Sequence, residues 1–334
     1  MSGTVRPPAL RPGDTIAIVP TARAIALDEL KDGIALAERW GLKVRLAPNI
    51  GERWYQQAST GEERVHHLVE ALRDPEVRAV WCARGGYGTV HLMEWDLSFL
   101  RDDPKWVIGF SDITVLHNAL HAMGISSLHA QMPFSIGNKT PETVETFRAA
   151  LFGEPWSIAS TFDPAAHAAE AARIGARNGV LLQTPGECEG VLVGGNLSVL
   201  YSLRGTPFDL DPRGKILFLE DLDELLYHMD RMTMNLKLGR WFRDLAGLVV
   251  GGMSEMRNKN EQDPFGKTAE QIIAGAAMYH GYPKCFQFPA GHIADNRALI
   301  LGQKAKLSVT ADGATLSFGG NGGPSCSTAG GAEA

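Results

Sequence analysis

Short apolar runs alternate with amphipathic segments through the first part of this chain, and this alternation limits the fold more than any other feature. Four runs predict buried strands, at residues 15–19, 42–47, 77–83 and 106–110. Residues 27–40, 62–72 and 112–123 lie between or after them and repeat apolar side chains at helical spacing. Strands separated by helices favour a mostly parallel sheet covered on both faces, so we expect a doubly wound α/β fold.

The pattern changes beyond this region. Residues 156–184, with a proline, a run of alanines and two glycines, predict a connection between two domains. Further apolar runs follow, and residues 306–318 predict a hairpin that turns at Asp312-Gly313. A chain of 334 residues is long enough for two domains. We therefore expect an N-terminal α/β domain (1–155), a smaller β-rich α/β domain (185–318) and a disordered tail rich in Gly, Ser and Ala (319–334).

Composition excludes several classes of protein. The formal charge is -6 and no basic stretch stands out, so a nucleic-acid partner is not expected. No apolar stretch reaches bilayer length and the first residues do not form a secretory signal, so we expect a soluble cytoplasmic protein. The four cysteines form no C-x-x-C pair, which argues against a disulfide framework or a zinc site. They are Cys82, Cys188, Cys285 and Cys326. No cofactor is indicated.

The serine at position 111 follows a predicted strand and precedes a predicted helix, in the run Gly109-Phe110-Ser111-Asp112. A strand-turn-helix elbow raises a serine hydroxyl above the carboxyl edge of a sheet, beside the first amides of the helix. Those amides can stabilise the oxyanion that develops in acyl transfer. Serine also caps helices commonly, and this segment alone favours the cap because G-x-S-D is not G-x-S-x-G.

A glycine-rich turn, Arg84-Gly85-Gly86-Tyr87-Gly88, comes directly after the third predicted strand. Glycines allow positive φ and a close approach of the backbone to a ligand, and exposed amides here could bind an anion. A simple tight turn explains the same residues equally well. The placement adds weight, because open parallel sheets bind ligands at this edge.

A serine nucleophile requires a base and a group that orients the base. His292 lies in a loop with proline and glycine, where functional side chains often occur. Glu220 directly follows the apolar run 216–219, and a solvated and a functional acid are equally good interpretations there. For Asp221 we favour a solvated acid at the start of a helix. For His117, on the predicted helix after the serine, we favour a surface position.

Together these segments resemble the LD-carboxypeptidase family, which includes the microcin-immunity peptidases. The resemblance extends from about Leu10 to Leu307 and rests on four blocks in a fixed order. The blocks are Cys82 to Gly88, Gly109 to Thr114, Gly194-Gly195-Asn196 through to Leu219-Glu220-Asp221, and Gly291-His292.

The resemblance implies a Ser-Glu-His triad formed by Ser111, Glu220 and His292, and an oxyanion hole of backbone amides from Asp112 and the Gly85-Gly86 turn. It also implies a flavodoxin- or glutamine-amidotransferase-like N-terminal domain, with the site between the two domains. The implied reaction is hydrolysis of the L,D-amide of a murein tetrapeptide, which releases terminal D-Ala during cell-wall recycling. Hydrolysis of a microcin-type aminoacyl-nucleotide and a non-catalytic binding function are the alternatives.

The resemblance further implies a peptide substrate and a homodimer. Arg84 could pair with the terminal carboxylate of the substrate or equally brace the loop, and we expect Asn196 to contact the substrate. The chain departs from the usual family pattern at His91, at His129-Ala130-Gln131, at Arg204 and at Leu226, none of which belongs to the triad.

Overall fold

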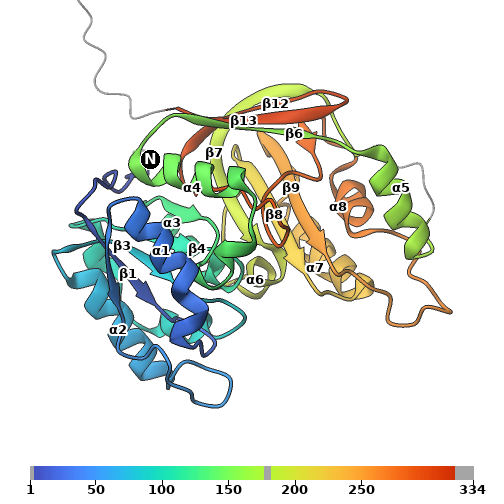
Figure 1. Cartoon of the computed structure of the whole chain (residues 1–334). Coiled ribbons are helices and arrows are strands. Elements are labelled where there is room, and N and C mark those ends of the chain that lie inside the picture. Colours follow the sequence, from blue (N-terminus) through green and yellow to red (C-terminus); the bar gives the residue numbers. More distant parts are fainter. Residues whose placement is uncertain (1–3, 177–181, 320–334) are drawn as a thin grey trace, which may run out of the picture.

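Two β-sheets, each flanked by helices, form the protein in a computed structural model that describes residues 4–176 and 182–319 (Figure 1). The first sheet has the strand order β11-β5-β4-β3-β1-β2, and the second has the order β10-β9-β8-β7-β12-β13-β6. The mixed α/β class and the mostly parallel first sheet agree with the sequence prediction.

The first sheet is parallel from β2 to β5 and has one antiparallel edge strand, β11, which comes from the far end of the chain. The order 2-1-3-4-5 is that of flavodoxin-like folds, in which ligands bind beyond the carboxyl ends of the strands. The strands are β1 (Thr15–Val19), β2 (Lys43–Leu46), β3 (Val77–Cys82), β4 (Trp106–Gly109), β5 (Ser127–His129) and β11 (Leu299–Leu301).

Helices cover both faces of this sheet because its strands present alternate apolar side chains to each side. One core packs α1 and α4 on residues such as Ile16 and Trp81, and the opposite core packs α2 and α3 on Ala17 and Val80. The helices are α1 (Lys31–Arg39), α2 (Gly61–Arg73), α3 (Thr114–Ala122) and α4 (Pro141–Phe152). Short 3-10 segments accompany them: η1 (Leu27–Leu30), η2 (Thr89–Glu94), η3 (Ser98–Arg101), η4 (Ser111–Ile113) and η5 (Pro133–Asn138).

The second sheet joins a parallel half, β7 to β10, to an antiparallel half that contains the predicted hairpin. One face of the parallel half is covered by α6, α7 and α8, and its other face shares an apolar core with the first sheet. The elements are β6 (Trp156–Thr161), β7 (Gly186–Asn196), β8 (Ile216–Leu222), β9 (Gly247–Ser254), β10 (Lys284–Cys285), β12 (Lys304–Val309), β13 (Gly313–Phe318), α5 (Pro164–Arg173), α6 (Leu197–Ser202), α7 (Leu226–Leu238) and α8 (Ala269–Ala277).

The predicted interdomain connection, residues 156–184, contributes β6 and α5 to the second half of the molecule, and residues 177–181 lie outside the described part. The weak sequence pattern of β6 reflects its position at the edge of the sheet, where alternate side chains face solvent. The domain limits themselves stay a prediction. The tail predicted to be disordered lies, from residue 320 onward, outside the described residues.

Among the described residues, no helix has the length and apolar character needed to span a membrane.

Cys82 in β3 is fully buried, as the sequence predicted, and Cys82, Cys188 and Cys285 are free thiols. Cys326 falls outside the described residues.

Candidate active site

Ser111 stands at a sharp turn between β4 and α3. Its φ of 65° lies in the left-handed region, which costs a non-glycine residue free energy and is common where a side chain must be aimed at a ligand. The segment η4 that begins at Ser111 has Phe110 as its N-cap and no side-chain cap bond. Helix capping therefore does not account for this serine.

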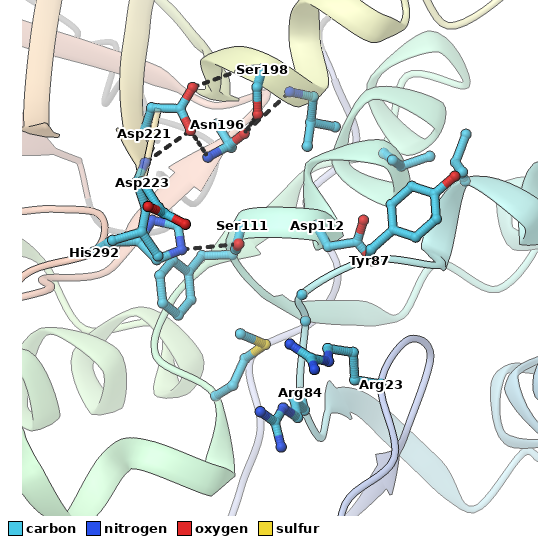
Figure 2. Close-up of a pocket in the computed structure, with 18 of the residues that line it drawn as sticks. Arg23, Arg84, Tyr87, Ser111, Asp112, Asn196, Ser198, Asp221, Asp223 and His292 are labelled. Carbon is cyan, nitrogen blue, oxygen red and sulfur yellow. Dashed lines mark hydrogen bonds between the residues drawn. The ribbon is translucent and has the colours of Figure 1, made fainter. Parts of the chain in front are cut away.

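A line of hydrogen bonds joins Ser111, His292 and Glu220, which are far apart in the sequence. His292 Nε2 lies 3.0 Å from Ser111 Oγ, and His292 Nδ1 lies 2.6 Å from Glu220 Oε2. Figure 2 shows the first of these contacts, with His292 reaching Ser111 from the second half of the chain. A hydroxyl, an imidazole and a carboxylate in this order can activate an alcohol as a nucleophile.

The environment of Glu220 and His292 stabilises their charged forms. Glu220 is fully buried, which by itself raises its pKa, but the neighbouring His292 and His129 lower that pKa below its ordinary value. Burial in turn lowers the pKa of His292, but the charge and hydrogen bond of Glu220 outweigh it and raise the pKa above its ordinary value. The pair is therefore built to stabilise an imidazolium next to a carboxylate.

The loop that presents His292 is held by contacts from both halves of the chain. Gly291 has a φ of 105°, and a Cβ atom there would lie 2.7 Å from the Cβ of Glu220. The Gly291 amide donates to Asn296 Oδ1 at 2.7 Å, and Asn296 Nδ2 donates to Gln131 Oε1 at 3.0 Å. Gln131, at one of the positions that depart from the family pattern, thus supports the histidine loop.

Asp112 ties the serine elbow to the glycine-rich turn. Its buried carboxylate accepts hydrogen bonds from the amide and the hydroxyl of Thr89, at 2.9 and 2.6 Å. A Cβ atom on Gly85 would lie 3.6 Å from the Asp112 amide nitrogen, so the turn and the elbow are in contact. Gly86 has a φ of 105°. The Asp112 amide lies in the first helical turn, where a backbone amide has no intrahelical acceptor, and an amide in such a position can bind an oxyanion.

Asp221, which the sequence analysis expected to be solvated, is 1% exposed, so that expectation is wrong. Strand β8 continues through this residue, and its carboxylate accepts from Asn196 Nδ2 at 2.8 Å and from the amides of Ser198 and Leu222 at 2.9 Å each. Burial, together with the charge of Glu220, raises the pKa of Asp221 to about 7.

Asn196 lines the cleft beside Asp221, as Figure 2 shows, but its side chain is already engaged. Besides the bond to Asp221, its Oδ1 caps α6 by accepting from the Val199 amide at 3.1 Å. The residue is 4% exposed. This arrangement favours a role in positioning the strand end over a direct contact with substrate.

The cleft around Ser111 has a volume of about 720 Å³ and lies between the two halves of the molecule. Arg84, predicted from sequence, lines it, and so does Arg23, which sequence reasoning missed. Figure 2 shows both guanidinium groups on the same side of Ser111, opposite Asp221 and Asp223. Arg23 follows β1 as Arg84 follows β3, so its position at the same sheet edge was the signal that could have found it.

His117 corrects a second expectation, because it is buried and not on the surface. Its ring bonds to Ser127 Oγ at 2.9 Å and to the Gly109 carbonyl at 3.0 Å, which fixes the end of β4 just before the elbow. Burial lowers the pKa of His117 to about 3, so the ring is neutral.

The one group of potential metal ligands among the described residues lies on α2 and does not line the cleft. It consists of His66, His67 and Glu70.

Comparison with known proteins finds relatives that match nearly the whole chain. The LD-carboxypeptidase N-terminal domain matches residues 16–130, and the LD-carboxypeptidase C-terminal domain matches residues 189–307. A probable murein peptide carboxypeptidase of Bacillus subtilis is 32% identical over 319 residues, covering 94% of this chain and 95% of that protein. The murein tetrapeptide carboxypeptidase of Pseudomonas aeruginosa is 29% identical, covering 87% of this chain and 92% of that protein.

Solved structures show the same fold. The muramoyltetrapeptide carboxypeptidase from Oxalobacter formigenes superposes with a TM-score of 0.77 at 27% identity, covering 91% of this chain and 98% of that chain. A microcin self-immunity protein in complex with glutamyl sulfamoyl guanosine gives a TM-score of 0.78 at 19% identity, covering 93% and 98%. With both domain matches in order and a relative this similar along its full length, the chain belongs to the LD-carboxypeptidase family of serine-type carboxypeptidases.

Proposed function

We propose that this protein hydrolyses the L,D-amide bond of murein tetrapeptides and releases the terminal D-Ala, with Ser111 as nucleophile, His292 as base and Glu220 as the orienting acid. The observation that carries the proposal is the line from Ser111 Oγ through His292 to Glu220, at 3.0 and 2.6 Å, in which Ser111 and His292 line the cleft and Glu220 is buried behind them. The names of the Bacillus and Pseudomonas relatives support the substrate class.

In the first half of the reaction, His292 Nε2 takes the Ser111 proton while Oγ bonds to the scissile carbonyl carbon. Glu220 holds Nδ1–H and stabilises the imidazolium. The amides of Asp112 and of the Gly85-Gly86 turn stabilise the negative oxygen. The imidazolium then protonates the amide nitrogen, the C–N bond breaks and D-Ala leaves, which gives an acyl-enzyme on Ser111.

In the second half, water replaces the departed amine. His292 removes a proton from that water as its oxygen attacks the ester carbonyl, and the same proton returns to Ser111 Oγ when the C–O bond breaks. The product is a tripeptide with a new terminal carboxylate. The D-Ala carboxylate of the substrate lies, in this proposal, against the arginines of the cleft, Arg84 and Arg23.

The proposal extends to a cytoplasmic homodimer that acts in cell-wall recycling. Light scattering of the purified chain measures the oligomeric state, and a monomer at micromolar concentration would contradict the dimer without affecting the chemistry.

The test is incubation of the pure protein with a murein tetrapeptide and, in parallel, with an aminoacyl-nucleotide conjugate of the microcin type. We expect free D-Ala from the first substrate, and none from the Ser111→Ala, Glu220→Ala and His292→Ala variants beyond a trace. Nucleotide release without D-Ala release would favour the immunity-type activity. Release from neither substrate, with retained binding, would favour a non-catalytic function.

A further inference from the structure

A second hollow, with a volume of about 510 Å³, lies beside the catalytic cleft and is flanked by two exposed tryptophans. Trp54 and Trp95 are 55% and 51% exposed. Tryptophan is normally among the more buried residues, so two indoles open to solvent at one hollow indicate a binding surface. The side chains that join them around the hollow include Gln57, Glu62, His91 and Glu94.

Trp95 also lines a neighbouring hollow with Glu62 and His66, so space is open on more than one side of its ring. Trp54 is followed by the exposed Tyr55, whose ring centroid lies 5.3 Å from that of Trp54 in an edge-on arrangement. Aromatic faces of this kind suit a ligand that has an apolar face of its own.

The hollow and the catalytic cleft share a wall. Arg23 of the cleft pairs through its backbone with Gln57 of the hollow. Tyr87 of the cleft is 51% exposed, and its ring centroid lies 5.8 Å from that of His91 in the hollow. A ligand that leaves the cleft over Tyr87 therefore meets His91 and the tryptophans next.

A buried arginine fixes this shared wall. Arg64 donates to the Ser59 carbonyl at 2.8 Å, to the Thr21 carbonyl at 3.2 Å and to the Gly88 carbonyl at 3.4 Å. It thus braces the loop after β1, the loop that carries Trp54 and the glycine-rich turn. These three bonds fix the backbone on both sides of the wall, which reduces the conformational freedom that a ligand of the hollow must restrict.

We propose that this hollow binds the amino-sugar end of a glycan-linked stem peptide while its peptide end occupies the cleft. The inference rests on the proposed function, and the name of the Oxalobacter structure, a muramoyltetrapeptide carboxypeptidase, carries the same chemistry. A pyranose has an apolar C–H face for the indoles and a rim of hydroxyls for the side chains of Gln57, Glu62 and Glu94. Glu62 and Glu94 repel a phosphate at the exposed rim, whereas the guanidinium of Arg64, which also lines the hollow, is buried and bonded to three backbone carbonyls. A nucleotide therefore fits this hollow less well.

The kinetic test compares kcat/KM for a free tetrapeptide with that for the same tetrapeptide on N-acetylmuramic acid. In wild type we expect the glycan-linked substrate to be preferred on the order of ten-fold, equivalent to about 1.4 kcal/mol. Trp54→Ala and Trp95→Ala should each reduce this ratio, and the double variant should bring it to about one. Trp95→Phe keeps a stacking face and should retain part of the ratio.

Tyr279→Ala is the matched control, because Tyr279 is 83% exposed and does not line the hollow. It should leave the ratio as in wild type. A wild-type ratio of one, or an unchanged ratio in the double tryptophan variant, would overturn the inference.

A binding test separates this inference from the proposed function. N-acetylmuramic acid and its disaccharide with N-acetylglucosamine are titrated into the Ser111→Ala variant, with tryptophan fluorescence and calorimetry as readouts. We expect saturable binding that the Trp54→Ala/Trp95→Ala double substitution removes. If wild type hydrolyses no tetrapeptide, the proposed function fails whatever the sugar does. If a nucleoside monophosphate binds at this hollow and the sugars do not, the sugar inference fails whatever the peptide does.

Discussion

The backbone N–H of Asn196 donates a hydrogen bond to Thr114 Oγ1 at 3.0 Å, across the interface between the two halves of the chain. Thr114 begins α3 directly after the serine elbow, and Asn196 ends β7 beside the strand that carries Glu220. Next to this bond, a Cβ atom on Gly195 would lie 2.6 Å from the same hydroxyl oxygen, so the two backbones approach as closely as a glycine permits. We therefore expect the position of Ser111 relative to His292 to depend on this contact.

The substitution Thr114→Val keeps the shape of the side chain and removes the acceptor. A buried amide left without an acceptor costs about 1–3 kcal/mol. The Asn196 amide can find another acceptor only if the two halves of the chain shift relative to each other. We expect a lower free energy of unfolding in urea and a fall in kcat/KM on the order of ten- to a hundred-fold, since small displacements at a reacting group are costly. Thr114→Ser keeps the oxygen and should retain most of the activity. Equal activity of the two variants would show that this bond does not set the geometry.

Gly291→Ala should displace the loop that presents His292 and so reduce activity. A methyl group there meets the Cβ of Glu220 at 2.7 Å, and the φ of 105° is unfavourable for alanine. We expect a loss of about 1–3 kcal/mol of stability with a large loss of activity. Gly281→Ala is the control, because a Cβ at Gly281 meets no atom within 4 Å, and thermal unfolding of both variants checks the difference.

The alternation of strands and helices in the first half of the chain and the elbow could be predicted because both follow from local patterns. A run of apolar residues that ends at Gly109-Phe110-Ser111 leaves few alternatives to a strand followed by a turn. The partners Glu220 and His292 could not be derived in this way, since they approach Ser111 only when the second sheet packs on the first. The family resemblance supplied them, and the geometry brings the three side chains together.

The two expectations that were wrong share a physical cause. His117 looked like a polar side chain on an exposed helix face, but α3 is covered by the second half of the chain as well as by its own sheet. Asp221 looked like a solvated acid, but β8 pairs with β9 through this residue, where Asp221 lies opposite Met253. When a distant part of the chain buries a residue, the sequence around that residue does not show it.

Glu220→Gln should change the pH profile as well as the rate. His292 acts as a base only when neutral, so kcat/KM rises as pH rises through its pKa, which Glu220 holds above the ordinary value. In the glutamine variant the negative charge that raises the pKa of His292 is lost, while burial still lowers that pKa. The rise of kcat/KM with pH, which is the acid limb of the pH–rate profile, should therefore move to lower pH. The maximal rate should fall by roughly 10³- to 10⁴-fold. Glu189→Gln, an exposed change on the neighbouring strand, should leave both limb and rate as in wild type, and an upward shift of the limb in the Glu220 variant would contradict this account.

Arg23, rather than Arg84, should make the larger contribution to binding of the terminal carboxylate. The guanidinium of Arg84 is already occupied, at 3.5 Å from the Ala24 carbonyl, 3.7 Å from Glu29 and 5.2 Å from the ring of Phe134. Arg23 is exposed, packs its aliphatic part on Gly86, and has no side-chain ion pair with any residue in the described part of the chain. A charged hydrogen bond of this kind is worth about 1.5–3 kcal/mol, so Arg23→Ala should lower kcat/KM by about ten- to a hundred-fold, mostly through KM.

The comparison that isolates this contact uses a tetrapeptide and its C-terminal amide. Wild type should prefer the free acid, because only the acid offers a carboxylate to a guanidinium. Arg23→Ala should abolish that preference, and Arg84→Ala should keep most of it. Arg23→Lys should retain part of it, because lysine supplies the charge but not the planar guanidinium that binds a carboxylate through two bonds. If Arg84→Ala abolishes the preference and Arg23→Ala retains it, the carboxylate lies against Arg84, and the contacts of Arg84 with Glu29 and Phe134 must then break when substrate binds.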